Sequence, residues 1–203
     1  MKTEIVSFDS KEAVDSLKAG EVAAFPTETV YGLGCVYSSE AAFKKLVAVK
    51  RRPPEKPFTL MGGNSFRFED FAYLDEKVKR VIARFVPGPL TLLLKPKEHL
   101  PYWVTLKSPS IGIRIAGYSP LRDLIDRVGE PLLVPSANKS GEKPANSALE
   151  AYSIFNGEIP YVIDAESPHS KPSTIIDFSK EKPVLIRQGE LSFEDVLKVY
   201  EGE

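Results

Sequence analysis

Cysteine and histidine are scarce in this 203-residue chain. It contains one cysteine, Cys35, and two histidines, His99 and His169. A single cysteine excludes an intrachain disulfide, and so few cysteine and histidine ligands argue against a structural zinc site. Both histidines lie in loop-like segments without a second ligand at helical spacing, which predicts solvated surface residues and no protein-bound metal.

Long apolar runs are also missing. The apolar runs are as short as residues 90–94, far below the length that spans a bilayer, and the first residues contain no apolar signal region. Together with the single cysteine, these absences predict a cytoplasmic protein that has no membrane partner.

No charge of one sign dominates, and several familiar catalytic motifs are absent. Lys and Arg number 27 against 28 Asp and Glu, for a net charge of −1, which argues against a globally polybasic nucleic-acid or membrane binder. The sequence contains no G-x-x-x-x-G-K-[ST] phosphate loop, no G-x-S-x-G elbow and no H-E-x-x-H. Tyr37 stands where Gly32-Leu33-Gly34 would need the third glycine of a dinucleotide fingerprint, which disfavours a Rossmann site.

Proline, in contrast, is abundant. The 17 prolines exceed the roughly 5% of average proteins, and they are spread from Pro26 to Pro183 instead of gathering in a linker. No stretch is Gly/Ser-rich, repetitive or of low complexity. We therefore expect a single domain over residues 1–203.

Short apolar or β-branched runs alternate with amphipathic helical patterns. The runs predict strands at residues 22–25, 58–61, 91–94, 111–115, 132–134, 161–163, 174–176 and 184–186. Helical patterns follow the caps Asp9, Ser39, Asp75 and Ser119-Pro120, and two more cover residues 147–155 and 192–200. The alternation predicts an α/β or α+β fold, a sheet with helices packed on it, and leaves the strand order open.

Two predicted strands run into polar segments. Residues 25–34 read Phe-Pro-Thr-Glu-Thr-Val-Tyr-Gly-Leu-Gly, and residues 135–141 read Pro-Ser-Ala-Asn-Lys-Ser-Gly. Strand ends are where α/β folds bind ligands, and short hydroxyl and amide side chains there suit a phosphate or a nucleobase. Both segments are equally compatible with hydrogen-bonded turns, in which Thr27 and Thr29 satisfy local backbone and Asn138 is a turn residue.

Residues 44–56 form a cationic window in an otherwise neutral chain. Its six cations are opposed by Glu55 alone, a net charge of +5; they are Lys44, Lys45, Lys50, Arg51, Arg52 and Lys56. Prolines 53, 54 and 57 interrupt helix geometry just past Lys50, so Arg52 and Lys56 are expected to project from a stiff loop that suits phosphate clamping. The alternative is a solvated basic surface.

Two further cations accompany apolar strands. Arg114 lies inside the run 111–115, and Arg187 directly follows the run 184–186. Strand alternation favours a solvent-facing position for such residues. The alternative is that the two side chains converge on an anion.

Seven ordered blocks span nearly the whole chain. They are residues 26–34, Lys50-x-Arg52-Pro53, residues 87–91, residues 112–114, residues 135–141, residues 172–174 and Arg187-x-Gly189. Together they resemble the YrdC-type threonylcarbamoyl-AMP synthases, and seven blocks in order are far more specific than any one of them. The resemblance implies a YrdC-like fold: a twisted mixed sheet with flanking helices and a concave cationic cleft.

The resemblance also implies a reaction. In this family L-threonine, bicarbonate and ATP form threonylcarbamoyl-AMP and pyrophosphate, and the product passes to a tRNA threonylcarbamoyl transferase complex for the t6A37 modification. The threonine amine forms a carbamate whose oxygen attacks the α-phosphorus, so no covalent protein nucleophile is needed, which agrees with the scarcity of cysteine and histidine. Positioning and cationic stabilisation of the phosphates suffice, with Mg²⁺ as the expected counter-ion of ATP.

Site roles follow from the resemblance residue by residue. ATP phosphates and catalysis are assigned to Lys50, Arg52, Ser136 and Asn138, and further ATP contacts to Lys56, Ser110 and Arg187. The threonine-binding positions are Thr29, Met61, Arg114 and Ser173, with Arg114 pairing with the threonine carboxylate.

Two positions depart from the family pattern. Residues 58–61 end in Met61 where the synthases usually have histidine, and their sequence Phe-Thr-Leu-Met resembles the YciO branch; Pro144 stands where Ser or Thr is usual. Methionine cannot hydrogen-bond as imidazole does, which bears on threonine affinity and amino-acid specificity.

Two other functions fit the same residues. One is a non-catalytic module that binds double-stranded RNA through the cationic region. The other is a related nucleotidyl or carbamoyl transferase with a different small acceptor.

Overall fold

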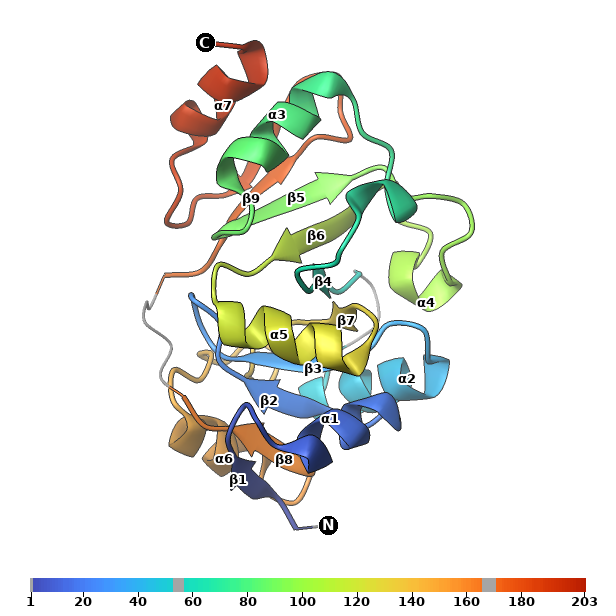
Figure 1. Cartoon of the computed structure of the whole chain (residues 1–203), viewed down its shortest axis with the longest axis vertical. Coiled ribbons are helices and arrows are strands. Elements are labelled where there is room, and N and C mark those ends of the chain that lie inside the picture. Colours follow the sequence, from blue (N-terminus) through green and yellow to red (C-terminus); the bar gives the residue numbers. More distant parts are fainter. Residues whose placement is uncertain (1, 53–56, 166–170) are drawn as a thin grey trace.

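The structure, a computed structural model, describes residues 2–52, 57–165 and 171–203. Within these ranges, ten strands form one twisted sheet in the order β1-β8-β2-β3-β7-β4-β6-β5-β9-β10 (Figure 1). The strands are β1 (Glu4–Val6), β2 (Ala23–Phe25), β3 (Gly32–Val36), β4 (Leu60–Gly62), β5 (Leu90–Leu94), β6 (Ile111–Ile115), β7 (Leu132–Leu133), β8 (Tyr161–Ile163), β9 (Thr174–Asp177) and β10 (Val184–Arg187).

Seven α-helices and one 3₁₀ turn accompany the strands in the described ranges. They are α1 (Lys11–Lys18), α2 (Glu40–Lys50), η1 (Phe68–Asp70), α3 (Glu76–Phe85), α4 (Tyr102–Thr105), α5 (Ser119–Val128), α6 (Ala148–Phe155) and α7 (Phe193–Glu201). The sheet is mixed, because it contains parallel pairs such as β4 with β6 and antiparallel pairs such as β5 with β6. The predicted fold class is thereby confirmed, whereas the single-domain organisation stays a prediction.

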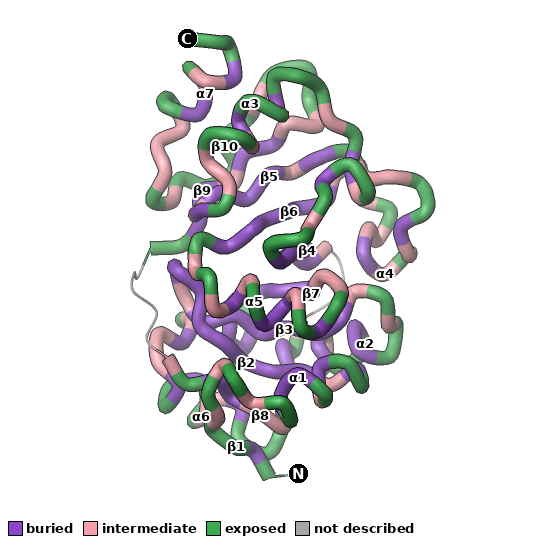
Figure 2. The backbone as a smooth tube through the Cα atoms, in the orientation of Figure 1, coloured by how far each residue is buried: buried purple, intermediate pink, exposed green. Residues whose placement is uncertain are grey.

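The middle of the sheet carries the core. Leu60 on β4 pairs with Leu133 on β7 and with Ile113 on β6, and all three side chains are 0% exposed. Figure 2 shows these central strands as a buried band, with exposed residues on the outer faces of the helices. Burial on both faces explains why these strands read as continuous apolar runs instead of alternating ones.

Of the four caps predicted by residue, Ser39 and Asp75 are confirmed, whereas α5 begins at Ser119 itself, with Tyr118 at the N-cap position and no side-chain cap hydrogen bond. Ser39 and Asp75 accept hydrogen bonds from the amides of Ala42 and Val78, as N-caps do. The first helix differs from its prediction, because its N-cap is Ser10 and not Asp9: the Ser10 hydroxyl accepts from the Ala13 amide at 3.1 Å. Ser10 lies one residue nearer the amides that need a partner.

The sequence reading missed β1 and β3. The glycines of β3 suggested a loop, but they allow close packing against Phe25 of β2: a Cβ at Gly34 would lie 2.5 Å from the Phe25 ring. β1 is a three-residue strand, and it joins the sheet through parallel pairing with β8 near the other end of the chain. Tertiary neighbours, which local sequence does not contain, define both strands.

Four of the helices pack together in two pairs. Helices α1 and α5 pack together in front of the middle strands, and α3 packs against α7 near the C-terminal end (Figure 1). The described N- and C-terminal residues lie at opposite ends of the molecule in this view. No helix among the described residues has the length and apolar character needed to cross a membrane.

Candidate functional site: a cationic cavity

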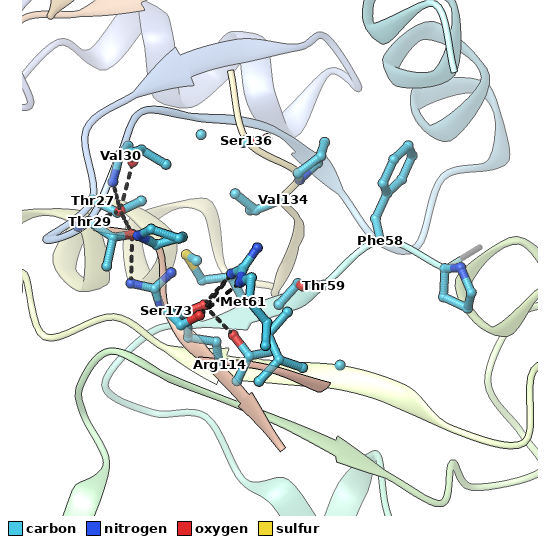
Figure 3. A pocket seen from close by; sticks show the side chains of 18 of the residues that line it. Thr27, Thr29, Val30, Phe58, Thr59, Met61, Arg114, Val134, Ser136 and Ser173 are labelled. Carbon is cyan, nitrogen blue, oxygen red and sulfur yellow. Dashed lines mark hydrogen bonds between the residues drawn. The ribbon is translucent and has the colours of Figure 1, made fainter. Parts of the chain in front are cut away.

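A cavity of about 620 Å³ opens where several strand ends and the last residue of α2 meet. The described residues that line it include four cations, Lys50, Arg52, Arg114 and Arg187, and no carboxylate. In the close-up of Figure 3, Thr29, Met61, Arg114 and Ser173 lie on one side of the pocket and Phe58 on the other. A cavity with this charge balance is suited to anionic ligands.

Lys50 ends α2 and is only 4% exposed. Its Nζ donates hydrogen bonds to the Ser136 carbonyl oxygen at 2.5 Å, to Asn138 Oδ1 at 2.6 Å and to Ser136 Oγ at 3.3 Å. Burial, and secondarily the positive charge of Arg52, lowers the pKa of Lys50 to about 8. The ammonium is thus held in place by the 135–141 segment before any ligand arrives.

Asn138 lies behind the cavity wall and is not among its lining residues. Its Oδ1 accepts hydrogen bonds from Lys50 and, at 2.6 Å, from the Ser136 hydroxyl, while its Nδ2 donates to the carbonyls of Lys139 and Glu142 at 2.8 Å each. The two donated bonds fix which way the amide faces. Asn138 therefore orients Lys50 and Ser136.

Two further contacts fasten the 135–141 segment to the end of α2. The Lys139 ammonium donates to the Val49 carbonyl at 2.9 Å and pairs with Glu158 at 2.6 Å. The amide and hydroxyl of Ser140 both donate to the Lys50 carbonyl, at 3.0 and 3.2 Å. Carbonyls at a helix C-terminus lack intrahelical partners, so these bonds satisfy groups that would otherwise be orphaned.

The cationic window does not act as one patch. Lys44 and Lys45 are exposed and pair with Glu40 at 2.9 Å and with Glu21 at 2.5 Å, so the alternative of a solvated basic surface describes them. Arg52 instead lines the cavity, with its guanidinium 5.2 Å from the centre of the Phe58 ring. Lys56, the other predicted loop contact, lies outside the described residues.

Arg114 is buried in β6, contrary to the solvent-facing position that alternation favours. Its Nη2 donates to Thr29 Oγ1 at 3.1 Å and forms an ion pair with Glu28 at 2.9 Å. The pair joins the β2–β3 loop to β6. Glu28 was not among the predicted site residues; its position between two pocket threonines was the available signal.

Arg187 reaches the same cavity from the end of β10. Its guanidinium donates to the Ser173 carbonyl at 2.9 and 3.0 Å and to the Ser173 hydroxyl at 3.1 Å, and that hydroxyl is 2.9 Å from Thr91 Oγ1. Partial desolvation and the charge of Arg114 lower the pKa of Arg187. The mutual effect of the two cations supports the alternative that they converge on an anion.

The remaining predicted positions are also at the cavity. Met61 is 2% exposed, lines the pocket and is the register partner of Arg114 on β6; Ser110 and Pro144 are lining residues too. Among the described residues, no cluster of three or more His, Cys, Asp or Glu is arranged to hold a metal ion. His99 is exposed, as expected, and His169 lies outside the described residues.

Three comparisons relate the chain to known proteins. A family model for the Sua5, YciO and YrdC proteins, described as "Telomere recombination", matches residues 15–189. A threonylcarbamoyl-AMP synthase of Pyrococcus abyssi is 35% identical over 189 residues, which cover 92% of this chain and 56% of that protein. A second, from Pseudoalteromonas atlantica, is 36% identical over 162 residues, which cover 77% of this chain and 86% of that protein.

Solved structures agree with this relationship. The crystal structure of P. abyssi Sua5 complexed with L-threonine has a TM-score of 0.91 and 33% identity; the match covers 97% of this chain and 61% of that one. The E. coli YciO structure, at 24% identity and a TM-score of 0.83, covers 95% of this chain and 98% of that one and shows the same fold. The chain thus spans little more than half of the P. abyssi protein, and it belongs to the Sua5/YciO/YrdC family.

Proposed function

We propose that the chain is an L-threonylcarbamoyladenylate synthase, which forms threonylcarbamoyl-AMP and pyrophosphate from L-threonine, bicarbonate and ATP. The observation that carries this proposal is the composition of the cavity, which gathers four cations and several hydroxyl groups without a lining carboxylate in the described ranges. The names of the relatives in Pyrococcus and Pseudoalteromonas point to the same reaction.

The chemistry asks for positioning and charge stabilisation. The threonine amine and bicarbonate form a carbamate with loss of water; a carbamate oxygen then attacks the α-phosphorus of ATP, and the bond to the β-phosphate oxygen breaks to release pyrophosphate. Negative charge accumulates on the phosphate oxygens in this step. Fixed cations in a partly desolvated cavity stabilise it without having to reorganise.

The two sides of the cavity divide the substrates between them. We assign ATP to the side of Lys50, Arg52, Ser110 and Ser136, with Arg52 and the Phe58 ring at its edge. Arg187 is assigned to the phosphates as well, because it is a cation that lines the same cavity and its guanidinium is held in place by Ser173. Asn138 acts by holding Lys50 and Ser136 in place. Lys56 remains a proposed ATP contact outside the described residues.

Threonine is assigned to the opposite side. There, Arg114 is a cation for the amino-acid carboxylate, Thr29 presents the hydroxyl that accepts from Arg114, and Ser173 presents a hydroxyl held by Arg187. Met61 contributes an apolar wall with no strong hydrogen-bonding group. The amine and carboxylate of threonine would thereby be held in the same cavity as the ATP phosphates, across from the residues assigned to ATP.

Magnesium does not fit as a protein-held ion, because the described lining residues offer no carboxylate ligand. We propose that it enters bound to ATP as a counter-ion, and no step relies on a protein-bound metal. We also propose that the product passes to a tRNA threonylcarbamoyl transferase, and that the protein is cytoplasmic, which the free and buried Cys35 supports.

Pyrophosphate release tests the proposal. The purified chain is incubated with ATP and Mg²⁺, with and without L-threonine and bicarbonate, and pyrophosphate and the adenylate product are measured. Release that requires both co-substrates is the expected result. Release that ignores threonine would refute the assignment in favour of another acceptor, and no release together with salt-sensitive binding of double-stranded RNA would favour the RNA-binding module.

A further inference from the structure

Glu28 lies directly behind the wall of the cavity. Its neighbours Thr27 and Thr29 line the cavity, whereas Glu28 does not. The carboxylate is buried, and its Oε1 accepts hydrogen bonds from Arg114 Nη2 at 2.9 Å and from the Gly117 amide at 2.8 Å. One oxygen atom therefore ties the loop between β2 and β3 to the residues at and just after the end of β6.

Arg114 is anchored on one side only. Its Nη2 donates to both Glu28 and Thr29, which uses the two hydrogens that this nitrogen carries. Its Nε is buried and has no hydrogen-bond partner among the described residues. Arg114 also lines the cavity, and its Nη1 donates to no described residue, so this nitrogen is the donor that remains for a ligand there.

The local electrostatics make this anchoring necessary. Arg187 lines the same cavity, and the charge of Arg114 lowers its pKa, so the two guanidiniums repel each other. A buried guanidinium flanked by Ile113 and Ile115 is unfavourable unless a carboxylate pairs with it. Glu28 supplies that charge without lining the cavity, so it does not occupy the space that a ligand needs.

We propose that Glu28 is a positioning residue, whose carboxylate holds the Arg114 guanidinium in the orientation that binds the carboxylate of the amino-acid substrate. Glu28 itself touches no substrate. The inference rests on the proposed function, because it takes Arg114 as the partner of that carboxylate.

The test compares Glu28→Ala with Glu28→Gln. KM is measured separately for L-threonine and for ATP, and inhibition by L-threoninol, which has no carboxylate, is measured alongside. Glu28→Ala is expected to raise the threonine KM at least about tenfold with the ATP KM nearly unchanged. Inhibition by threoninol should not weaken. Glu28→Gln should raise the threonine KM less, because its amide oxygen still accepts from Arg114 and Gly117.

Asp177→Asn is the matched control, since Asp177 is another buried carboxylate and is not a lining residue. It should lower thermal stability without a selective change in KM. The inference fails if the Glu28 variants leave the threonine KM unchanged or raise both KM values equally. If Glu28→Ala does not fold, Glu28→Gln decides by the same criterion.

A second readout does not depend on turnover. The Nε–H signal of Arg114 in ¹⁵N NMR should be observable in the wild type and should shift or broaden in Glu28→Gln, whereas an unaltered signal contradicts the positioning role. Wild-type pyrophosphate release that ignores threonine would instead refute the proposed function, and the NMR result would still show whether Glu28 orients Arg114.

Discussion

The ammonium nitrogen of Lys50 lies 2.6 Å from Oδ1 of Asn138, a residue 88 positions further along the chain. Lys50 ends a helix, and Asn138 lies in the segment after β7, yet the two share a hydrogen-bond network with Ser136. Because Asn138 is not a lining residue, this network places a catalytic candidate in the cavity and its support behind it. Replacing such a supporting residue should disturb the position of the buried cation without removing a direct contact to the ligand.

Replacing Asn138 by Ala should therefore misplace Lys50. The change removes an acceptor from both Lys50 and Ser136, so kcat should fall at least about tenfold and the free energy of unfolding by about 1–3 kcal/mol. Steady-state kinetics and thermal denaturation measure the two effects. Asn156→Ala, at an exposed position next to α6, is the control and should change neither; a fully active Asn138→Ala would contradict the role assigned to this residue.

The low pKa of Lys50 predicts a pH dependence. If the charged ammonium is the form that binds phosphate, kcat/KM for ATP should decline as the pH rises through about 8 in the free enzyme. Saturating ATP adds negative charge beside Lys50, so the corresponding decline in kcat should occur at higher pH.

A charge-retaining variant is the control for this profile. Lys50→Arg keeps its positive charge well above pH 8, so the activity it retains should show no decline there.

The lowered pKa of Lys50 also predicts a pH dependence of stability. The folded-state pKa lies below the value of an unfolded lysine, so the unfolded chain binds more protons between about 8 and 10.5. Lys50 should therefore make stability rise with pH in this window, and Lys50→Met should remove that slope.

Met61→His tests the departure from the family pattern. Met61 is buried, lines the cavity and pairs in register with Arg114, so an imidazole there can offer the hydrogen bond that a thioether cannot. The KM for L-threonine should fall by a few-fold, up to about tenfold, for one added hydrogen bond. Competition by L-valine, which lacks the hydroxyl, should not strengthen. An unchanged threonine KM, or an equal gain for Met61→Leu, would count against this prediction.

Much of the fold could be predicted from sequence because its signals are local. The caps Ser39 and Asp75 sit where the structure places them, and the apolar run 111–115 is β6. The strand β3 could not be found in this way, because Gly32 and Gly34 look like loop residues until the Phe25 ring packs over them. The reason for a glycine in a strand can be recognised only when the residue that packs against it is known.

The site shows the same limit. The family resemblance predicted the site residues, and those in the described ranges line the cavity apart from Asn138, which lies behind its wall. The sum of charges over residues 44–56 could not reveal that Lys44 and Lys45 are paired with Glu40 and Glu21 on the surface. Whether a charge belongs to a site depends on its partners, and those partners lie elsewhere in the chain.

Gly189 provides a last prediction, since it holds two parts of the site together. Its amide donates to Thr174 Oγ1 at 3.0 Å, and a Cβ at this position would overlap the Pro172 carbonyl and the backbone around Thr174. Backbone atoms cannot move aside as a flexible side chain can. Gly189→Ala should therefore reduce the free energy of unfolding by about 1–3 kcal/mol. It should also displace Arg187 from Ser173, which raises the KM for ATP, the substrate assigned to Arg187.

Gly129→Ala separates this effect from backbone strain. Gly129 is the C-cap of α5 with φ of 92°, and, its chain neighbours and the helix backbone apart, no described heavy atom lies within 4 Å of a Cβ at this position. Alanine there should cost about 1–2 kcal/mol because of the left-handed backbone alone. Both variants should thus have lower melting temperatures than the wild type, but the KM for ATP should change only for Gly189→Ala. An unchanged KM in that variant would show that the contact between residues 172–174 and Gly189 supports the fold without positioning Arg187.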